Sequence, residues 1–234
     1  MNILLTGDSR GIGAAAFELL KKHGHNVVGH STRGGDDLLA ADLASAEETR
    51  ALWWEAMGRL DGRIDALINN AGIFEAAPID QSDEGWAEAW QRTMQINLAA
   101  AAELCRLAVL HFRERKQGGR IVNVASRAGF RGDSPDHWHY AASKAGVIAM
   151  TKTMARAYAA EGIYVFAVAP GFTVTGMVED YVASRGGAAF LSDIPLGRPA
   201  TAEEIAETIR WLAIDAPASA TGAILDVNGA SYVR

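Results

Sequence analysis

Short apolar runs alternate with longer amphipathic stretches along almost the whole chain. An apolar run of about four to eight residues is typical of a buried strand, whereas apolar residues three or four apart predict a helix with one buried side. The runs that we predict as strands are NILLT, NVVGH, LLAAD, ALIN, RIVNVAS, IYVFAVA and GAILDV. The stretches that we predict as helices are residues 12–23, 46–60, 84–115, 140–160 and 202–214.

This order of elements indicates a parallel sheet, because strands that run in the same direction need a crossover long enough for a helix. We therefore predict one α/β domain over residues 1–234, a doubly wound parallel sheet of about seven strands with helices on both faces. Only TRGGDDL separates the second predicted strand from the third, so a loop must make this connection. We expect left-handed backbone at Gly24, Gly118, Gly119 and Gly162, between helices and strands.

The composition changes this picture little and excludes several classes of protein. Of the 234 residues, 49% are apolar and 21% are charged, as in an ordinary soluble domain. The net charge of −6 argues against nucleic acid or an anionic membrane as a partner. A single cysteine allows no disulfide within the chain. We find no signal peptide or membrane-spanning run, and we expect a cytoplasmic protein.

A glycine-rich segment follows the first predicted strand and opens the first helix. It reads TGDSRGIGAAAFELL, with glycines at Gly7, Gly11 and Gly13. Missing side chains at such a turn let a pyrophosphate approach the free N–H groups of the helix start. A turn without a ligand is the alternative. We expect the Asp8 carboxylate to point away from the phosphates, because like charges repel.

A tyrosine and a lysine lie four residues apart in HYAASK, on one face of a predicted helix. An ammonium beside a phenol favours the phenolate, so Lys144 is expected to lower the pKa of Tyr140. A phenol adjusted in this way can act as a general acid or base on an alcohol or a carbonyl. Two residues alone are weak evidence, because such a pair also arises by chance.

Four motifs together are more specific. TGDSRGIG, NNAG, VNVAS ahead of YAASK, and APGF resemble the short-chain dehydrogenase/reductase family, in the order typical of that family and over the whole chain. The resemblance implies a Rossmann-type fold, a nicotinamide cofactor, and hydride transfer to or from a carbonyl carbon.

The resemblance also implies four catalytic residues. Tyr140 would exchange a proton with the substrate oxygen, and Ser126 would hold that oxygen. Lys144 would lower the Tyr140 pKa and bind the nicotinamide ribose. Asn97 would steady a water that links Lys144 to solvent. The spacing from Ser126 to Tyr140 is one residue longer than usual, which we interpret as a loop insertion.

The cofactor contacts follow from the same resemblance. They fall on Gly7, Ser9, Arg10, Gly11, Ile12, Gly13, Asp42, Asn70, Ala71, Gly72, Tyr140, Lys144, Pro170, Gly171, Thr173 and Thr175.

The end of the second predicted strand bears on which nicotinamide is bound. An acid at this place usually holds both ribose hydroxyls of NAD(H). This chain has Ser31, Thr32 and Arg33 there, and Arg10 could reach the same place. Two guanidinium groups and two hydroxyls favour a 2′-phosphate and hence NADP(H). NAD(H) stays open, since Arg33 could instead be a solvated loop residue.

The substrate is less constrained by the sequence. The nearest subfamily pattern is that of 3-oxoacyl-[acyl-carrier-protein] reductases, yet Gln117 and Glu161 stand where basic residues would dock an acidic carrier. We expect a small or medium-sized apolar carbonyl compound or alcohol, covered by a lid at about residues 172–196. A redox sensor without turnover is the rival prediction. Resemblance further implies a homotetramer or homodimer, and we expect no metal at His137 and His139.

Overall fold

The computed structural model describes residues 1–35, 37–174 and 192–234. A seven-stranded sheet forms its centre, in the order β3-β2-β1-β4-β5-β6-β9, and neighbouring strands are parallel. These strands are β1 (Asn2–Thr6), β2 (Asn26–Ser31), β3 (Leu38–Ala40), β4 (Ala66–Asn69), β5 (Gly119–Val124), β6 (Ile163–Pro170) and β9 (Ile224–Val227). All the predicted strands are confirmed.

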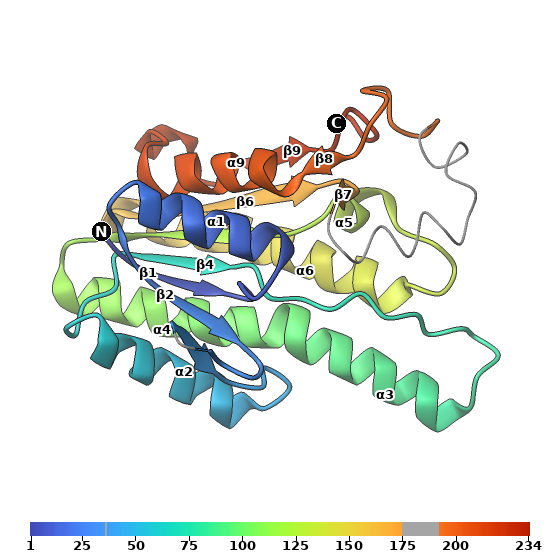
Figure 1. Cartoon of the computed structure of the whole chain (residues 1–234), viewed down its shortest axis with the longest axis horizontal. Helices are drawn as coiled ribbons and strands as arrows, with labels where there is room; N and C mark the ends of the chain where they lie inside the picture. The colour runs from blue at the N-terminus through green and yellow to red at the C-terminus, as the bar shows by residue number, and fades with distance from the viewer. Residues whose placement is uncertain (36, 175–191) are drawn as a thin grey trace.

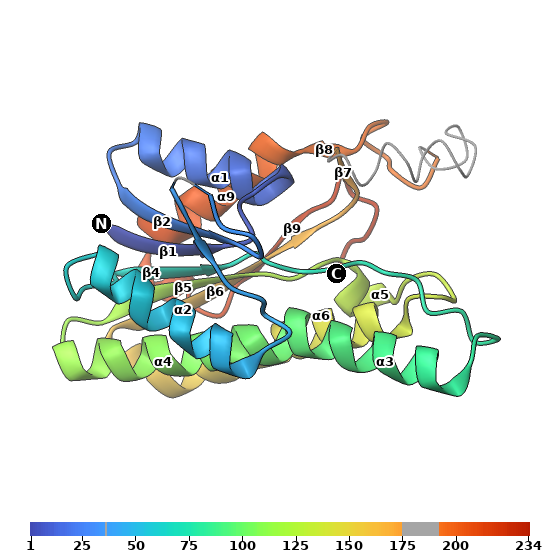
Figure 2. The same ribbon diagram turned by 60° about the horizontal axis from the view of Figure 1, so that its bottom comes forward.

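Helices cover both faces of this sheet (Figures 1 and 2). The helix α1 (Gly11–Lys22) lies with α9 (Ala202–Ile214) on one face. The other face carries α2 (Ala46–Arg59), α4 (Ala100–Arg115) and α6 (Trp138–Tyr158). The remaining helices are α3 (Asp83–Met94), the π-helix η1 (Gln95–Ala99), α5 (Ala128–Arg131), and the 3-10 turns η2 (Ala159–Glu161) and η3 (Ala218–Ala220). The fold is the predicted Rossmann-type α/β fold.

The core consists of two main layers, one on each side of the sheet. Ile3, Leu5 and Phe166 are fully buried toward α1 and α9. Leu4 and Leu67 are fully buried toward α2 and α4. Successive residues of β1 therefore enter opposite layers, which explains why the strands are continuous apolar runs in the sequence.

The predicted helix 84–115 is not one regular α-helix. It consists of α3, then five residues of π-helix, then α4. Asn97 lies in the π segment and is buried. By length and composition the run Asp83–Arg115 could cross a membrane, but half of its apolar window is buried inside the protein, as in a core helix.

Three of the four glycines expected in left-handed backbone are found there. Gly24, Gly118 and Gly162 have φ of 80°, 64° and 75°. A Cβ on Gly118 would lie 2.2 Å from the Gly162 carbonyl oxygen. The prediction for Gly119 is wrong, because its backbone does not have a positive φ. A Cβ on Gly119 would instead lie 2.5 Å from the ring of Phe112, so close packing requires this glycine.

Two connections bear on the site. The link from β2 to β3 has no helix in its described residues, as predicted; the Ser31 hydroxyl donates to the Gly34 carbonyl at 3.2 Å. The predicted lid at residues 172–196 falls largely outside the described residues. Near its start, β7 (Thr173–Val174) pairs with β8 (Ala200–Thr201), which lies just after the predicted lid.

Candidate active site

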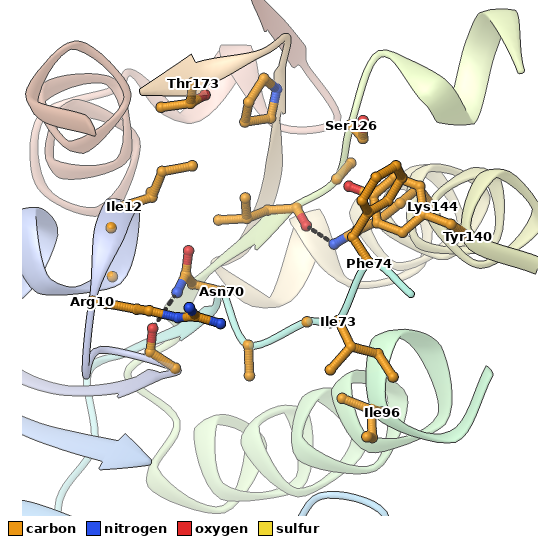
Figure 3. A pocket seen from close by; sticks show the side chains of 18 of the residues that line it. Arg10, Ile12, Asn70, Ile73, Phe74, Ile96, Ser126, Tyr140, Lys144 and Thr173 are labelled. Atoms are coloured by element: carbon orange, nitrogen blue, oxygen red, sulfur yellow. Dashed lines mark hydrogen bonds between the residues drawn. The ribbon is translucent and has the colours of Figure 1, made fainter. Parts of the chain in front are cut away.

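The carboxyl ends of the central strands border a cavity of about 450 Å³. From β1 the chain adds strands β2 and β3 on one side, and it then returns to add β4 on the other side. Folds of this kind usually bind their ligand at the point between β1 and β4 where the strand order reverses. Figure 3 shows Arg10 and Ile12 on one side of this cavity and Ser126, Tyr140 and Lys144 on the other. It is lined by seventeen of the predicted cofactor residues: Gly7, Ser9, Arg10, Gly11, Ile12, Gly13, Ser31, Thr32, Asp42, Asn70, Ala71, Gly72, Tyr140, Lys144, Pro170, Gly171 and Thr173.

The glycine-rich turn is held against the end of β4. Gly7 has φ of 74°, and a Cβ there would lie 2.6 Å from the Ala71 Cα. Asn70 donates from Nδ2 to the carbonyls of Thr6 and Gly7, at 3.0 and 2.7 Å. A Cβ on Gly13 would lie 2.0 Å from the Gly7 oxygen. The turn therefore depends on its glycines, and the Asn70 amide serves the turn itself.

The start of α1 keeps its N–H groups available to a ligand. Arg10, at the N-cap, makes no side-chain capping hydrogen bond, and the first turn has no acidic residue within this fully described helix. By contrast, α2, α3 and α9 begin with a serine or threonine cap and two acidic residues each. Free N–H groups and an uncompensated positive helix end suit a phosphate.

The expectation that Asp8 points outward is wrong. Asp8 is 5% exposed, and both carboxylate oxygens are buried with no hydrogen-bond partner among the described residues. Its side chain fills the space beside Gly29 of β2, where a Cβ would lie 1.6 Å from Asp8 Oδ2. Burial raises the pKa of Asp8 from 3.8 to about 7. A neutral carboxyl loses less by burial than a charged one, so packing overrides the expected repulsion.

Ser126, Tyr140 and Lys144 meet at the other end of the cavity. Lys144 Nζ donates to the Val124 carbonyl at 2.9 Å and lies 5.8 Å from the centre of the Tyr140 ring. Ser126 forms a side-chain hydrogen bond with Tyr140, and its Oγ also accepts the Ala128 N–H at 3.1 Å. The ends of β5 and the first turns of α6 therefore bring two hydroxyls and one ammonium together.

The expected effect of Lys144 on Tyr140 is not found in this arrangement. Burial raises the pKa of Tyr140 to about 12, although the Ser126 hydrogen bond opposes the rise. Burial lowers the pKa of Lys144 to about 8. The lysine donates its hydrogen bond to the Val124 carbonyl rather than to the phenol. Desolvation therefore dominates the pKa of both groups.

Asn97 supports the site from behind and does not line the cavity. Its amide donates to the Ile73 carbonyl at 2.9 Å and accepts the Ile73 N–H at 2.8 Å. It also donates to Ser143 Oγ at 3.3 Å. A Cβ on Gly72 would lie 3.3 Å from Asn97 Oδ1 and 3.4 Å from Lys144 Nζ, so only glycine leaves this space free. The water relay through Asn97 stays a prediction.

Two predicted contacts are not found at the cavity. Arg33 does not line it, because the described part of the tight turn after β2 directs Ser31 and Thr32 toward the cavity instead. Thr175 lies outside the described residues.

Sequence reasoning missed several lining residues. They are His30, Leu43, Ile73, Phe74, Arg92, Ile96, Val124, Ala125, Arg127, Asp133 and Phe172. Phe74 stacks on His137 with ring centres 3.8 Å apart and meets Tyr140 edge-on at 4.7 Å. Some of these residues directly follow a recognised motif: Ile73 follows NNAG, and Arg127 follows Ser126. Their position next to a motif was the signal that could have found them.

Comparison with known proteins agrees with this geometry. A family model described as enoyl-(acyl carrier protein) reductase matches residues 7–230. The 3-oxoacyl-[acyl-carrier-protein] reductase of Synechocystis sp. is 38% identical over 97% of this chain and 94% of its own length. The chain belongs to the short-chain dehydrogenase/reductase family.

Other short-chain dehydrogenase/reductase relatives bear different names. The 3beta-hydroxysteroid dehydrogenase 1 of Eggerthella lenta is 35% identical over 97% of this chain and 92% of its own length. The cis-4-hydroxycyclohexanecarboxylate dehydrogenase of Sinomonas cyclohexanicum is 38% identical over 97% of this chain and 94% of its own length. The protein is an oxidoreductase of this family, acting between C=O and CH–OH groups.

The residues present fit a nicotinamide dinucleotide. The glycine turn and the uncapped start of α1 suit the pyrophosphate, and the space left by Gly72 lies beside Lys144. Such a cofactor supplies or accepts a hydride at its nicotinamide ring.

Proposed function

We propose that this protein is an NADP(H)-dependent oxidoreductase that transfers a hydride between nicotinamide and the carbonyl or secondary alcohol of a small or medium-sized apolar compound. One observation carries the proposal. The Ser126 and Tyr140 hydroxyls and the Lys144 ammonium share the cavity that begins at the glycine-rich turn.

The proposed roles follow from what each group can donate. In the reductive direction, Tyr140 gives its proton to the substrate oxygen as the carbonyl becomes an alcohol. The Ser126 hydroxyl donates a hydrogen bond to the same oxygen. Lys144, which is buried and has a lowered pKa, holds a proton close to Tyr140. Asn97 fixes Ile73 at the cavity wall and, in this proposal, connects Lys144 to solvent through a water.

The preference for NADP(H) rests on the residues near the end of β2. Arg10, Ser31 and Thr32 line this part of the cavity, and none of them is acidic. A guanidinium and two hydroxyls bind a 2′-phosphate better than they bind bare ribose hydroxyls. Asp42 also lines the cavity, and in this proposal it accepts a hydrogen bond from the adenine amine. NAD(H) is the alternative cofactor.

Apolar side chains favour an apolar substrate. Ile73, Phe74, Ile96 and Phe172 line the cavity. We infer a substrate whose carbon skeleton packs against these side chains while its oxygen meets Ser126 and Tyr140.

The second candidate function is 3-oxoacyl-[acyl-carrier-protein] reduction, which is the name of the Synechocystis relative. Surface charge argues against it. Glu161 is paired with Arg113 at 2.7 Å. Arg115 is paired with Asp65 at 2.8 Å and is nearly buried. These arginines are therefore engaged within the protein and offer little to an acidic carrier.

We further propose a cytoplasmic homotetramer or homodimer, without nucleic acid or membrane as a partner. In this proposal, α4 and α6 pair between copies of the chain, and the small residues on the surface of α6 allow close approach.

The test combines turnover with one variant and its control. Purified protein with NADPH is assayed on free ketones and on acetoacetyl thioesters, by loss of reduced-nicotinamide absorbance. Tyr140→Phe should lower kcat at least 100-fold while NADPH affinity changes little, because only the transferable proton is lost. Tyr158→Phe, a change on the same helix and remote from the cavity lining, should keep full activity. Tight NADPH binding with no turnover on any compound would favour the redox sensor instead.

A further inference from the structure

A buried cation stands beside the proposed catalytic serine. Arg127 follows Ser126, and its N–H donates to the Pro170 carbonyl at 3.0 Å. The Arg127 side chain is only 9% exposed. Its guanidinium carbon lies 4.4 Å from the centre of the Phe172 ring. Arg127, Phe172 and Ser126 all line the same cavity.

The positive charge of Arg127 is poorly compensated. Asp193 is the carboxylate at ion-pair distance among the described residues, with Oδ2 3.4 Å from Arg127 Nη1. The same oxygen lies closer to Arg131 Nη1, at 2.9 Å. Asp193 is also half-exposed. Asp133 lines the cavity too, but it is exposed and its Oδ1 accepts the Ser134 N–H. Within the described part of the chain, the two guanidinium groups therefore share one solvated carboxylate at ion-pair distance, with Asp133 acting only from farther away.

This environment favours an anionic ligand. Burial lowers the pKa of Arg127, and the neighbouring Arg131 charge lowers it further. A carboxylate that entered the cavity would recover the interaction energy that burial removed. Phe172 lies against one face of the Arg127 guanidinium. The edge of a guanidinium can donate two parallel hydrogen bonds to a planar carboxylate.

We propose that Arg127 binds a carboxylate group of the substrate, so that the enzyme acts on oxo acids or hydroxy acids. This inference rests on the proposed function, because it places the acid beside the carbonyl that Ser126 and Tyr140 hold. Ser126, Arg127 and Tyr140 line the same cavity, so one small molecule can present its carbonyl to the hydroxyls and its acid to the guanidinium. Because both groups share this one cavity, the proposal commits to a small free acid and not to the phosphate of a carrier arm.

The test compares acids with neutral partners of the same shape. The substrates are 3-oxo-, 4-oxo- and 5-oxohexanoate, each with its methyl ester. In the wild type, kcat/KM for the best acid should exceed that for its ester at least tenfold. Arg127→Gln should reduce this ratio about tenfold or more, mainly through KM for the acid, and Arg127→Lys should restore part of it. Arg59→Gln, at an exposed arginine of α2 that does not line the cavity, should leave the ratio unchanged.

A binding measurement separates this inference from the proposed function. Calorimetry compares hexanoate with hexanamide on NADP⁺-saturated wild type and Arg127→Gln. We expect hexanoate to bind the wild type at least tenfold more tightly than the variant, with hexanamide unaffected. Equal hexanoate affinity in both proteins, or equal turnover of acids and esters by the wild type, overturns the inference. Selective hexanoate binding without turnover of any compound contradicts the proposed function and leaves the acid site standing.

Discussion

The acidic side chain of Asp8 is buried, although a carboxylate is normally stabilised by water or by hydrogen bonds. Its carboxyl is enclosed between the glycine-rich turn and β2, where only a glycine at position 29 leaves room for it. Neither oxygen has a partner among the described residues. A buried carboxylate without a partner is costly, so the folded protein holds this proton more tightly than the unfolded chain does.

The pH dependence of stability follows from this difference. With a pKa of about 7 in the folded state and 3.8 unfolded, Asp8 costs nothing at pH 3 and progressively lowers stability as pH rises toward 7. Asp8→Asn removes the titration. The variant should therefore gain stability relative to the wild type as pH rises from 4 to 8, by up to about 4 kcal/mol at pH 8. Urea unfolding over this range measures it.

A matched control is Asp80→Asn, because Asp80 is exposed. Its stability difference from the wild type should be nearly constant with pH. If the Asp8→Asn and Asp80→Asn curves ran parallel, the buried carboxyl would not be titrating as described.

The elements are delimited by local hydrogen bonds that the sequence encodes. The helix α9 starts with a full capping box, in which Thr201 Oγ1 accepts the Glu204 N–H and Glu204 accepts the Thr201 N–H. Arg198 also holds Glu204 at 2.7 Å, and this hydrogen bond is the main reason that the pKa of Glu204 falls to about 2. The cap therefore fixes the residue at which β8 ends and α9 begins.

Loss of this cap should have a measurable cost. Thr201→Ala leaves the Glu204 N–H without its acceptor and should destabilise the protein by about 1 kcal/mol, or about 2–4 °C in Tm. Thr208→Ala serves as the control, because Thr208 lies inside the same helix and bonds only within it. A Tm at or above that of the wild type for Thr201→Ala would mean that the box contributes nothing. Differential scanning calorimetry distinguishes these outcomes.

At the scale of the whole molecule, the parallel sheet gathers distant residues at one edge. The ends of β1, β4, β5 and β6 bring Gly7, Asn70, Ser126 and Pro170 to a single cavity. Each of these strands is fixed by its neighbours, so a ligand that spans the cavity links segments from the N-terminal turn to β7. Binding of the cofactor should therefore stabilise the entire fold.

Thermal shifts test both this linkage and the cofactor preference. At a hundredfold excess over Kd, NADPH should raise Tm by about 5 °C or more, and at equal concentration NADH should raise it less. Arg10→Gln should remove most of the difference, because it loses the guanidinium that we propose binds the 2′-phosphate. Arg33→Gln should keep the difference, since Arg33 does not line the cavity. A larger shift with NADH would contradict the NADP(H) preference.

Local pattern was enough to predict the strands, the main helices and their parallel arrangement. Apolar periodicity depends on residues close together in the chain, and the glycine and Tyr-Lys motifs are equally local. The Tyr-Lys spacing singled out Tyr140 and Lys144, the family resemblance of the motifs added Ser126, and the three do lie together in the cavity.

Tertiary structure alone decided what surrounds each group. The burial of Asp8 against Gly29, the contact of Lys144 with Val124 and the position of Arg127 over Phe172 all join segments that are distant or unrelated in pattern. The charge and the pKa of a side chain depend on how far such neighbours exclude water from it. The spacing of residues along the chain does not predict this desolvation. The sequence by itself therefore determined the fold and the class of chemistry, and packing decided the protonation, the counterions and the anion-binding wall of the cavity.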